Sequence, residues 1–199
     1  MKLYSGPLCL YSHVCRFVLS EKEIGYEVIY STNGRTDQEV AELNPYGETP
    51  TLVDRDLVLY DSMVVSEYLD EKFPHPPLLP SDPTARAQAR VMVTRLRRDW
   101  LDALQFCITT GTRVDKKLSK SLWGGLMAMS NHFGQQKYAL GNEFSLVDCY
   151  LAALLWRLPV LKIDLPRQAS KILDYGGRMF DKPGFQASLS EAEREIRAA

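Results

Sequence analysis

Hydrophobic and polar positions in the first part of the chain alternate between short strand-like runs and helical faces. The pattern predicts strands at residues 2–5 and 26–30 and, between them, a helix at 12–22 with one apolar face. This order predicts a parallel strand pair joined by a right-handed crossover. A short helix is expected next, from a capping pattern at Thr36 to about Leu43.

The clearest β pattern follows. Two apolar runs, Thr51–Val53 and Leu57–Tyr60, flank a polar triplet, as in a β-hairpin. Pro50 stands immediately before the first run, where a proline does not interrupt the ladder. Asp61 and Ser62 close the second run with small oxygen-bearing side chains that favour a helix start. With that helix, the predicted order is βαβαββα.

A proline-rich segment ends this α/β half. Four prolines fall within Pro74–Pro80, which excludes helix or inner strand and is typical of a stiff, extended polyproline-like connection. We predict an α/β domain at residues 1–74, a linker at 75–82 and an all-helical domain at 83–199. The segment is either a plain spacer or a partner surface, because rigid prolines lose little entropy on binding.

Helical periodicity extends through the second half. Asp82 caps a helix with Pro83 in its first turn, and apolar positions recur along one long helix to about Cys107. Its arginine-rich opposite face suits an acidic protein partner or plain solvation. Ser145 and Asp148 form a capping box ahead of a nearly all-apolar helix, the expected core of this domain.

The composition, 45% hydrophobic and 25% charged residues over 199 residues, suits a folded protein without stabilising metal or disulfides. The formal net charge of −1 offers no global basic field, so direct nucleic-acid binding is not expected. No apolar run approaches the roughly 18–20 residues of a membrane span, and no signal peptide is expected. The four cysteines lack paired spacing, which predicts free thiols in a reducing cytoplasm and no metal site.

Candidate chemistry centres on Cys9, which follows the first strand at the start of the first helix. A helix N-terminus can activate a thiol, but an ordinary loop cysteine has the same pattern. Tyr4 and Ser5 are alternative hydroxyls, and Tyr4 also fits a half-buried strand position. His13 fits a surface helix residue better than a general base.

The proline, hairpin and Asp-Ser order resembles the thioredoxin-like domain of the glutathione S-transferase family. The resemblance implies a cis bond before Pro50, a backbone clamp at Thr49 for the cysteinyl part of glutathione, and a grip by Asp61 and Ser62 on the γ-glutamyl end. Cys9 then falls where omega-class thiol transferases hold their catalytic cysteine, although the proline expected after it is replaced. A glutathione-dependent transferase using Cys9 is therefore the alternative function.

The assembled motifs resemble, more narrowly, the stringent starvation protein A family of bacterial RNA polymerase-associated proteins, built on the same fold. The resemblance extends over nearly the whole chain and is carried by the segments Leu3–Pro7, Tyr11–His13, Pro50–Arg55, Glu67–Leu78, Glu143–Leu151, Leu155–Pro159 and Ser188–Glu195.

This narrower resemblance implies a cytoplasmic homodimer that binds RNA polymerase holoenzyme and its sigma factor and redirects transcription in starvation and acid stress. It implies no transferase activity, and glutathione would at most be a bound ligand. The partner surface that it implies consists of Pro74, His75, Pro76 and Pro77.

Overall fold

The computed structural model describes residues 1–31 and 38–198. The chain forms two compact units: Met1–Pro76 together with the C-terminal segment Gly184–Ala199, and Pro77–Pro183. The predicted α/β first half and all-helical second half are confirmed. The C-terminal segment differs from expectation, because it groups with the α/β unit and not with the helical one.

The first unit is built on a four-stranded mixed sheet in the order β2-β1-β3-β4. The strands β1 and β2 are parallel, as predicted, whereas β1 and β3, and β3 and β4, are antiparallel. The strand bounds are β1 Lys2–Ser5, β2 Glu27–Tyr30, β3 Thr51–Asp54 and β4 Leu57–Tyr60.

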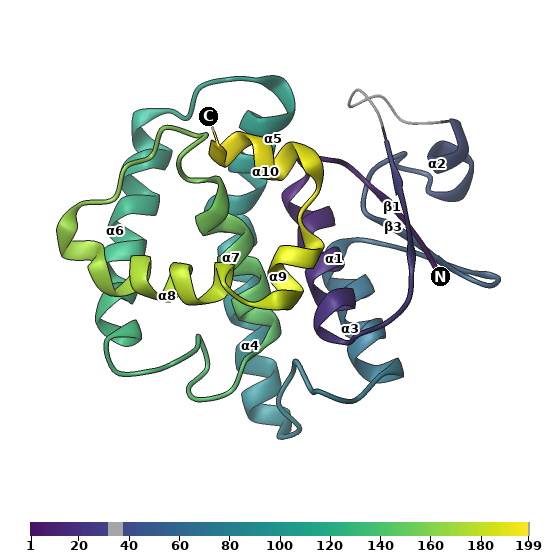
Figure 1. Cartoon of the computed structure of the whole chain (residues 1–199), viewed down its shortest axis with the longest axis horizontal. Coiled ribbons are helices and arrows are strands. Elements are labelled where there is room, and N and C mark those ends of the chain that lie inside the picture. Colours follow the sequence, from purple (N-terminus) through teal and green to yellow (C-terminus); the bar gives the residue numbers. More distant parts are fainter. Residues whose placement is uncertain (32–37, 199) are drawn as a thin grey trace. The chain divides into compact units, whose positions relative to one another are not determined.

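Helices α1 and α3 lie on one face of this sheet, and α2 lies on the other (Figure 1). The C-terminal helices α9 and α10 run beside α1 (Figure 1). The expected start of α2 at Thr36 lies outside the described residues. The bounds are α1 Leu10–Glu21, α2 Gln38–Leu43, α3 Ser62–Lys72, α9 Pro183–Ser188 and α10 Glu191–Ala198.

The helical unit has α7 as its core, since all twelve residues of that helix are buried. The predicted capping box at Ser145 and Asp148 is present. Asp148 also accepts hydrogen bonds from the Tyr175 hydroxyl at 2.7 Å and the Ala139 N–H at 2.8 Å. The α-helices of the helical unit are α4 Pro83–Leu96, α5 Asp102–Thr110, α6 Lys116–Phe133, α7 Leu146–Arg157 and α8 Ser170–Phe180.

The long helix expected to run to Cys107 is interrupted by a π-helical turn at Arg97–Leu101. Within this turn, Trp100 donates from its indole nitrogen to the Ser121 hydroxyl of α6 at 3.2 Å. Its ring packs over Gly125, where an added Cβ would lie 2.1 Å from the ring. The turn thus coincides with a bulky side chain that fits against a glycine of α6.

None of the described helices combines the length and apolarity that crossing a bilayer requires.

Candidate functional site

The loop between β1 and α1 packs against the turn before β3. The Gly6 N–H lies 3.1 Å from the Thr49 hydroxyl and 3.2 Å from the Ser12 hydroxyl. Cys9 is the N-cap of α1, and its sulfur accepts from the Ser12 N–H at 3.4 Å. The Cys9 thiol also donates to the Thr49 carbonyl at 3.6 Å. Residues 40 positions apart in the sequence therefore meet at one thiol.

The peptide bond between Thr49 and Pro50 is cis, which confirms that part of the expectation. Pro50 is buried, whereas Thr49 and Cys9 are both partly exposed. The carbonyl of Thr49, part of the backbone expected to clamp a ligand, therefore already accepts from the Cys9 thiol. Cys9 has a structural role as the N-cap of α1. It is also partly exposed, and a reactive thiol must be accessible.

Asp61 and Ser62 begin α3, as predicted. The Asp61 carboxylate accepts from the Met63 N–H at 2.8 Å and the Val64 N–H at 3.4 Å. Asp61 adopts a left-handed φ of 71°, a conformation that non-glycine residues take mainly where the surrounding structure enforces it. The Ser62 side chain is 2% exposed.

This arrangement fits glutathione in part. A partly exposed carboxylate at Asp61 can pair with the amino group of a γ-glutamyl moiety. The γ-glutamyl moiety also has a carboxylate, which the backbone N–H groups at the start of a helix can bind. Here the N–H groups of Met63 and Val64 already donate to Asp61. Ser62 is too deeply buried to present its hydroxyl without movement. The four residues Thr49, Pro50, Asp61 and Ser62 stay a predicted glutathione site.

Tyr4 and Ser5 have structural partners instead of facing a ligand. The Tyr4 hydroxyl donates to Glu39. Burial, and then the hydrogen bond to the Glu39 carboxylate, raise the pKa of Tyr4 to about 12, so this phenol stays protonated at neutral pH. Ser5 is fully buried and accepts from the Arg16 guanidinium. Neither hydroxyl is placed to activate a thiol.

His13 is buried, which corrects the expectation of a surface residue. Its Nε2 lies 3.0 Å from the Ser188 hydroxyl, and its ring centroid lies 5.0 Å from that of Phe185. Both partners come from the C-terminal segment, which covers the face of α1 that the sequence pattern left to solvent. The periodicity of α1 alone cannot show that a segment more than 170 residues away in the sequence buries this face.

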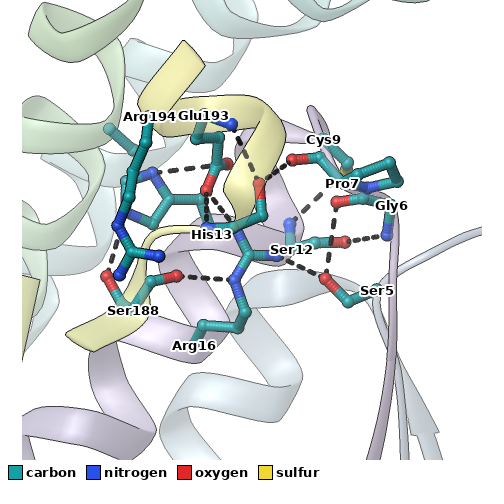
Figure 2. A network of polar contacts seen from close by, with 12 residues as sticks. Ser5, Gly6, Pro7, Cys9, Ser12, His13, Arg16, Ser188, Glu193 and Arg194 are labelled. Atoms are coloured by element: carbon teal, nitrogen blue, oxygen red, sulfur yellow. Dashed lines mark hydrogen bonds and ion pairs between the residues drawn. The ribbon is translucent and has the colours of Figure 1, made fainter. Parts of the chain in front are cut away.

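A buried polar network holds this segment in place (Figure 2). Arg16 pairs with Glu193 at 2.5 Å and donates from Nε to the Ser188 carbonyl at 2.7 Å. The Ser190 hydroxyl donates to the Pro7 carbonyl at 2.5 Å, within the loop that carries Cys9. The network therefore links the C-terminal segment to the loop that carries the candidate thiol.

Ser190 and Glu193 also cap α10, because the Ser190 N–H lies 2.9 Å from Glu193 Oε2 and the Glu193 N–H lies 3.1 Å from the Ser190 hydroxyl. The spacing of these two residues is a local capping signal. Their second role, as partners of α1 and its preceding loop, had no local signal.

The predicted partner surface is exposed at all four residues, Pro74, His75, Pro76 and Pro77. The extended conformation expected for the proline-rich segment is wrong for residues 73–76. The Lys22 ammonium lies 2.7 Å from the Phe73 carbonyl oxygen and 2.5 Å from that of Pro76, so those two oxygens lie within about 5 Å of each other. Residues three apart in a polyproline II helix are displaced by about 9 Å. Residues 73–76 therefore form a compact turn, which contains a cis bond between His75 and Pro76.

Charge is divided unequally between the two units. The first holds 16 Asp and Glu against 8 Lys and Arg, a formal charge of −8, and the second holds 9 against 16, a formal charge of +7. The whole-chain value of −1 therefore describes the field around neither unit. The expectation against direct nucleic-acid binding, which depended on that value, stays a prediction.

Comparison with known proteins bears on both units. Residues 3–77 match a family model described as "Glutathione S-transferase, N-terminal domain", and residues 112–183 match "Glutathione S-transferase, C-terminal domain". The crystallised ternary complex of BphK, a bacterial glutathione S-transferase, matches with a TM-score of 0.86 at 22% identity, covering 98% of this chain and 100% of that one. This likeness shows the fold.

Sequence relatives match over nearly the full length. A "Stringent starvation protein A homolog" of Coxiella burnetii is 43% identical over 199 residues, covering 99% of this chain and 95% of that protein. A protein of the same name from Pasteurella multocida is 42% identical over 191 residues, covering 95% and 90%.

Proposed function

The chain belongs to the stringent starvation protein A family, and from this premise we propose that it is a non-enzymatic adaptor that binds RNA polymerase holoenzyme with its sigma factor. In this role it regulates transcription during the stringent and stationary-phase response and in acid stress, inside the cytoplasm. The transferase fold is its scaffold, and the near full-length match to two members of this family supports the assignment.

The observation that carries this proposal is the exposure of Pro74–Pro77, a stretch that begins in the turn at residues 73–76. Three of its four side chains are proline rings, and the fourth is the imidazole of His75. Such a surface is apolar and conformationally restricted, so a partner binds it at a small entropic cost.

Copurification with RNA polymerase tests the surface. The variant Pro74→Ala/His75→Ala/Pro76→Ala is expected to lose at least tenfold in affinity for the holoenzyme. The variant Asn131→Ala/His132→Ala/Gln135→Ala also changes three exposed residues, one of them a histidine, and should bind normally. Wild-type binding by the first variant would refute the assignment of this surface.

We further propose that the adaptor is a homodimer. The opposite formal charges of the two units, −8 and +7, favour contact of the acidic unit of one copy with the basic unit of the other. A two-fold symmetric pair makes this contact twice. Sedimentation should therefore show a dimer that weakens between about 50 and 500 mM salt, where screening becomes severe. A monomer at the lower salt concentration would contradict the proposal.

A second candidate function is glutathione-dependent thiol transfer at Cys9. The observation in its favour is the meeting of a partly exposed Cys9 with Thr49, beside a cis-proline. It predicts that glutathione reduces a mixed disulfide in a reaction that Cys9→Ser abolishes. Cys107→Ser, which changes a buried thiol, should leave the reaction unchanged. Equal turnover in the wild type and Cys9→Ser would exclude this function.

Glutathione can also serve the adaptor as a bound regulator without being turned over. A thermal-shift titration separates this case from catalysis, because ligand binding to the folded state raises the midpoint even where no reaction occurs. Asp61→Asn should reduce the shift. An unchanged midpoint at millimolar glutathione would argue against any binding.

A further inference from the structure

Lys22 is a buried cation directly beneath the exposed proline turn. It is the C-cap residue of α1, and its side chain is 0% exposed. Its ammonium pairs with Asp70 of α3 at 2.5 Å, and it donates to the carbonyls of Phe73 and Pro76 at 2.7 and 2.5 Å. Three oxygen acceptors thus surround a group that has three N–H donors.

We propose that Lys22, held by Asp70, is the positioning residue of the partner surface: it fixes residues 73–76 as a turn and aims Pro74, His75 and Pro76 outward. The inference rests on the proposed function for its biological meaning. Lys22 itself is buried, so it acts through the exposed residues and not by touching a partner.

The energetics favour a dedicated role for this lysine. A buried ammonium is costly unless its charge is paired and its N–H groups are hydrogen-bonded. Asp70, which is 7% exposed, supplies the charge, while the two carbonyls satisfy the remaining donors. Because those carbonyls belong to positions 73 and 76, they cannot separate without leaving the ammonium partly unsatisfied. The buried ammonium of Lys22 therefore holds residues 73–76 in the turn.

This geometry also defines what a partner recognises. The carbonyls of Phe73 and Pro76 are bonded to Lys22, so they are not the groups offered to a partner. Grooves that take a polyproline II helix need an extended ligand, and this turn is not extended. The geometry points to a partner pocket that binds a compact cluster of proline rings together with one imidazole.

The test replaces the buried ion pair with apolar side chains of similar size, Lys22→Met/Asp70→Leu. Such a replacement generally preserves folding. The expected result is a folded protein whose affinity for RNA polymerase holoenzyme falls about tenfold. Pro74, Pro76 and Pro77 have no N–H, so the reporting group is the Phe73 amide, which donates to the Leu69 carbonyl at 3.0 Å. Its hydrogen exchange, measured on the free protein in a peptide spanning residues 70–78, should accelerate at least tenfold.

The matched control is Lys2→Met, which removes an exposed lysine of β1 on the same unit. Lys2 has no described bond to residues 70–78, so exchange and affinity should stay within twofold of wild type. If the double variant does not fold, Asp70→Asn replaces it, with about threefold effects expected in both measurements. Wild-type exchange and affinity in the folded double variant, or in Asp70→Asn, overturn the inference.

The failure of this inference differs from the failure of the proposed function. One case is that Pro74→Ala/His75→Ala/Pro76→Ala no longer binds polymerase, whereas Lys22→Met/Asp70→Leu and Asp70→Asn still bind it. The partner surface is then correct, and only the positioning role of Lys22 is refuted. The other case is that Lys22→Met/Asp70→Leu or Asp70→Asn accelerates exchange at residues 70–78 while the triple variant still binds polymerase. Lys22 then does hold the turn, and the partner surface lies elsewhere.

Discussion

The guanidinium of Arg16 lies 2.5 Å from the carboxylate of Glu193, and both side chains are at least 99% buried. The two residues are separated by 177 positions, so this ion pair joins the first helix to the last one. Arg16 also donates to the Ser5 hydroxyl and the Ser188 carbonyl, so its charge is paired and each of its three nitrogens has an acceptor. The C-terminal segment is therefore an integral part of the α/β unit.

Removing Glu193 should destabilise the protein strongly. Glu193→Ala leaves Arg16 as a buried, unpaired charge, and breaking one side of a buried pair typically costs about 3–5 kcal/mol. Urea unfolding followed by circular dichroism measures the loss. Glu195→Ala, at an exposed position of the same helix, should change the free energy of unfolding by less than about 0.5 kcal/mol. Comparable values for the two variants would mean that the ion pair does not hold the segment.

Gly125 and Gly124 are adjacent in α6 and should respond in opposite directions to alanine. A Cβ at Gly125 would lie 2.1 Å from the Trp100 ring, so Gly125→Ala forces repacking at a cost of about 1–3 kcal/mol. A Cβ at Gly124 meets nothing within 4 Å, so Gly124→Ala should stabilise the helix by about 0.5–1 kcal/mol. Thermal unfolding of the two variants compares them directly. A stabilising Gly125→Ala would show that Trp100 does not pack as described.

Gly6 controls the geometry around Cys9. A Cβ on Gly6 would lie 2.7 Å from the Cys9 Cβ and 3.0 Å from the Thr49 hydroxyl, so Gly6→Ala must displace this contact. We expect a loss of about 1–3 kcal/mol in stability and a changed rate of Cys9 alkylation by iodoacetamide. Gly25→Ala, with nothing within 4 Å of the added Cβ, should leave that rate unaltered. An alkylation rate unaffected by Gly6→Ala would contradict the close packing of Gly6, Cys9 and Thr49.

The parts of the fold that the sequence predicted well have local causes. The hairpin after Pro50 is encoded by two short apolar runs around a polar triplet, and the α7 start by a capping box four residues long. Asp61 likewise lies at the start of its helix and caps it. Each signal and the structure that it specifies occupy the same few residues, so one sequence suffices to detect them.

The parts that the sequence missed depend on distant partners. Arg16 and His13 lie on a helix where polar residues are normally assigned to solvent, and only the C-terminal segment buries them. Lys22 appears as an ordinary cation at the end of a helix until the turn at residues 73–76 places two carbonyls on it. Periodicity carries no information on such pairs, because their partners lie from about 50 to more than 170 residues away. Predicting them requires the tertiary fold.

Tyr4 should contribute to the loss of stability in alkali, because its pKa is higher in the folded than in the unfolded chain. Its pKa is raised to about 12 in the folded protein, against 10.0 for an unperturbed tyrosine. Below pH 10 both folded and unfolded chains keep this proton, so the contribution of Tyr4 to stability is complete. As the pH rises from 10 to 12, the unfolded chain releases the proton first, and the contribution is progressively lost.

Tyr4→Phe removes this dependence together with the hydrogen bond to Glu39. The variant should be less stable than wild type at pH 8, by about 1 kcal/mol, and the difference should shrink between pH 10 and pH 12. Urea unfolding at closely spaced pH values follows this convergence. Tyr46→Phe, at a ring that is 71% exposed, is the control and should show no such convergence. Curves for wild type and Tyr4→Phe that stay parallel from pH 8 to pH 12 would mean that Tyr4 loses its proton at the same pH in the folded and unfolded chains.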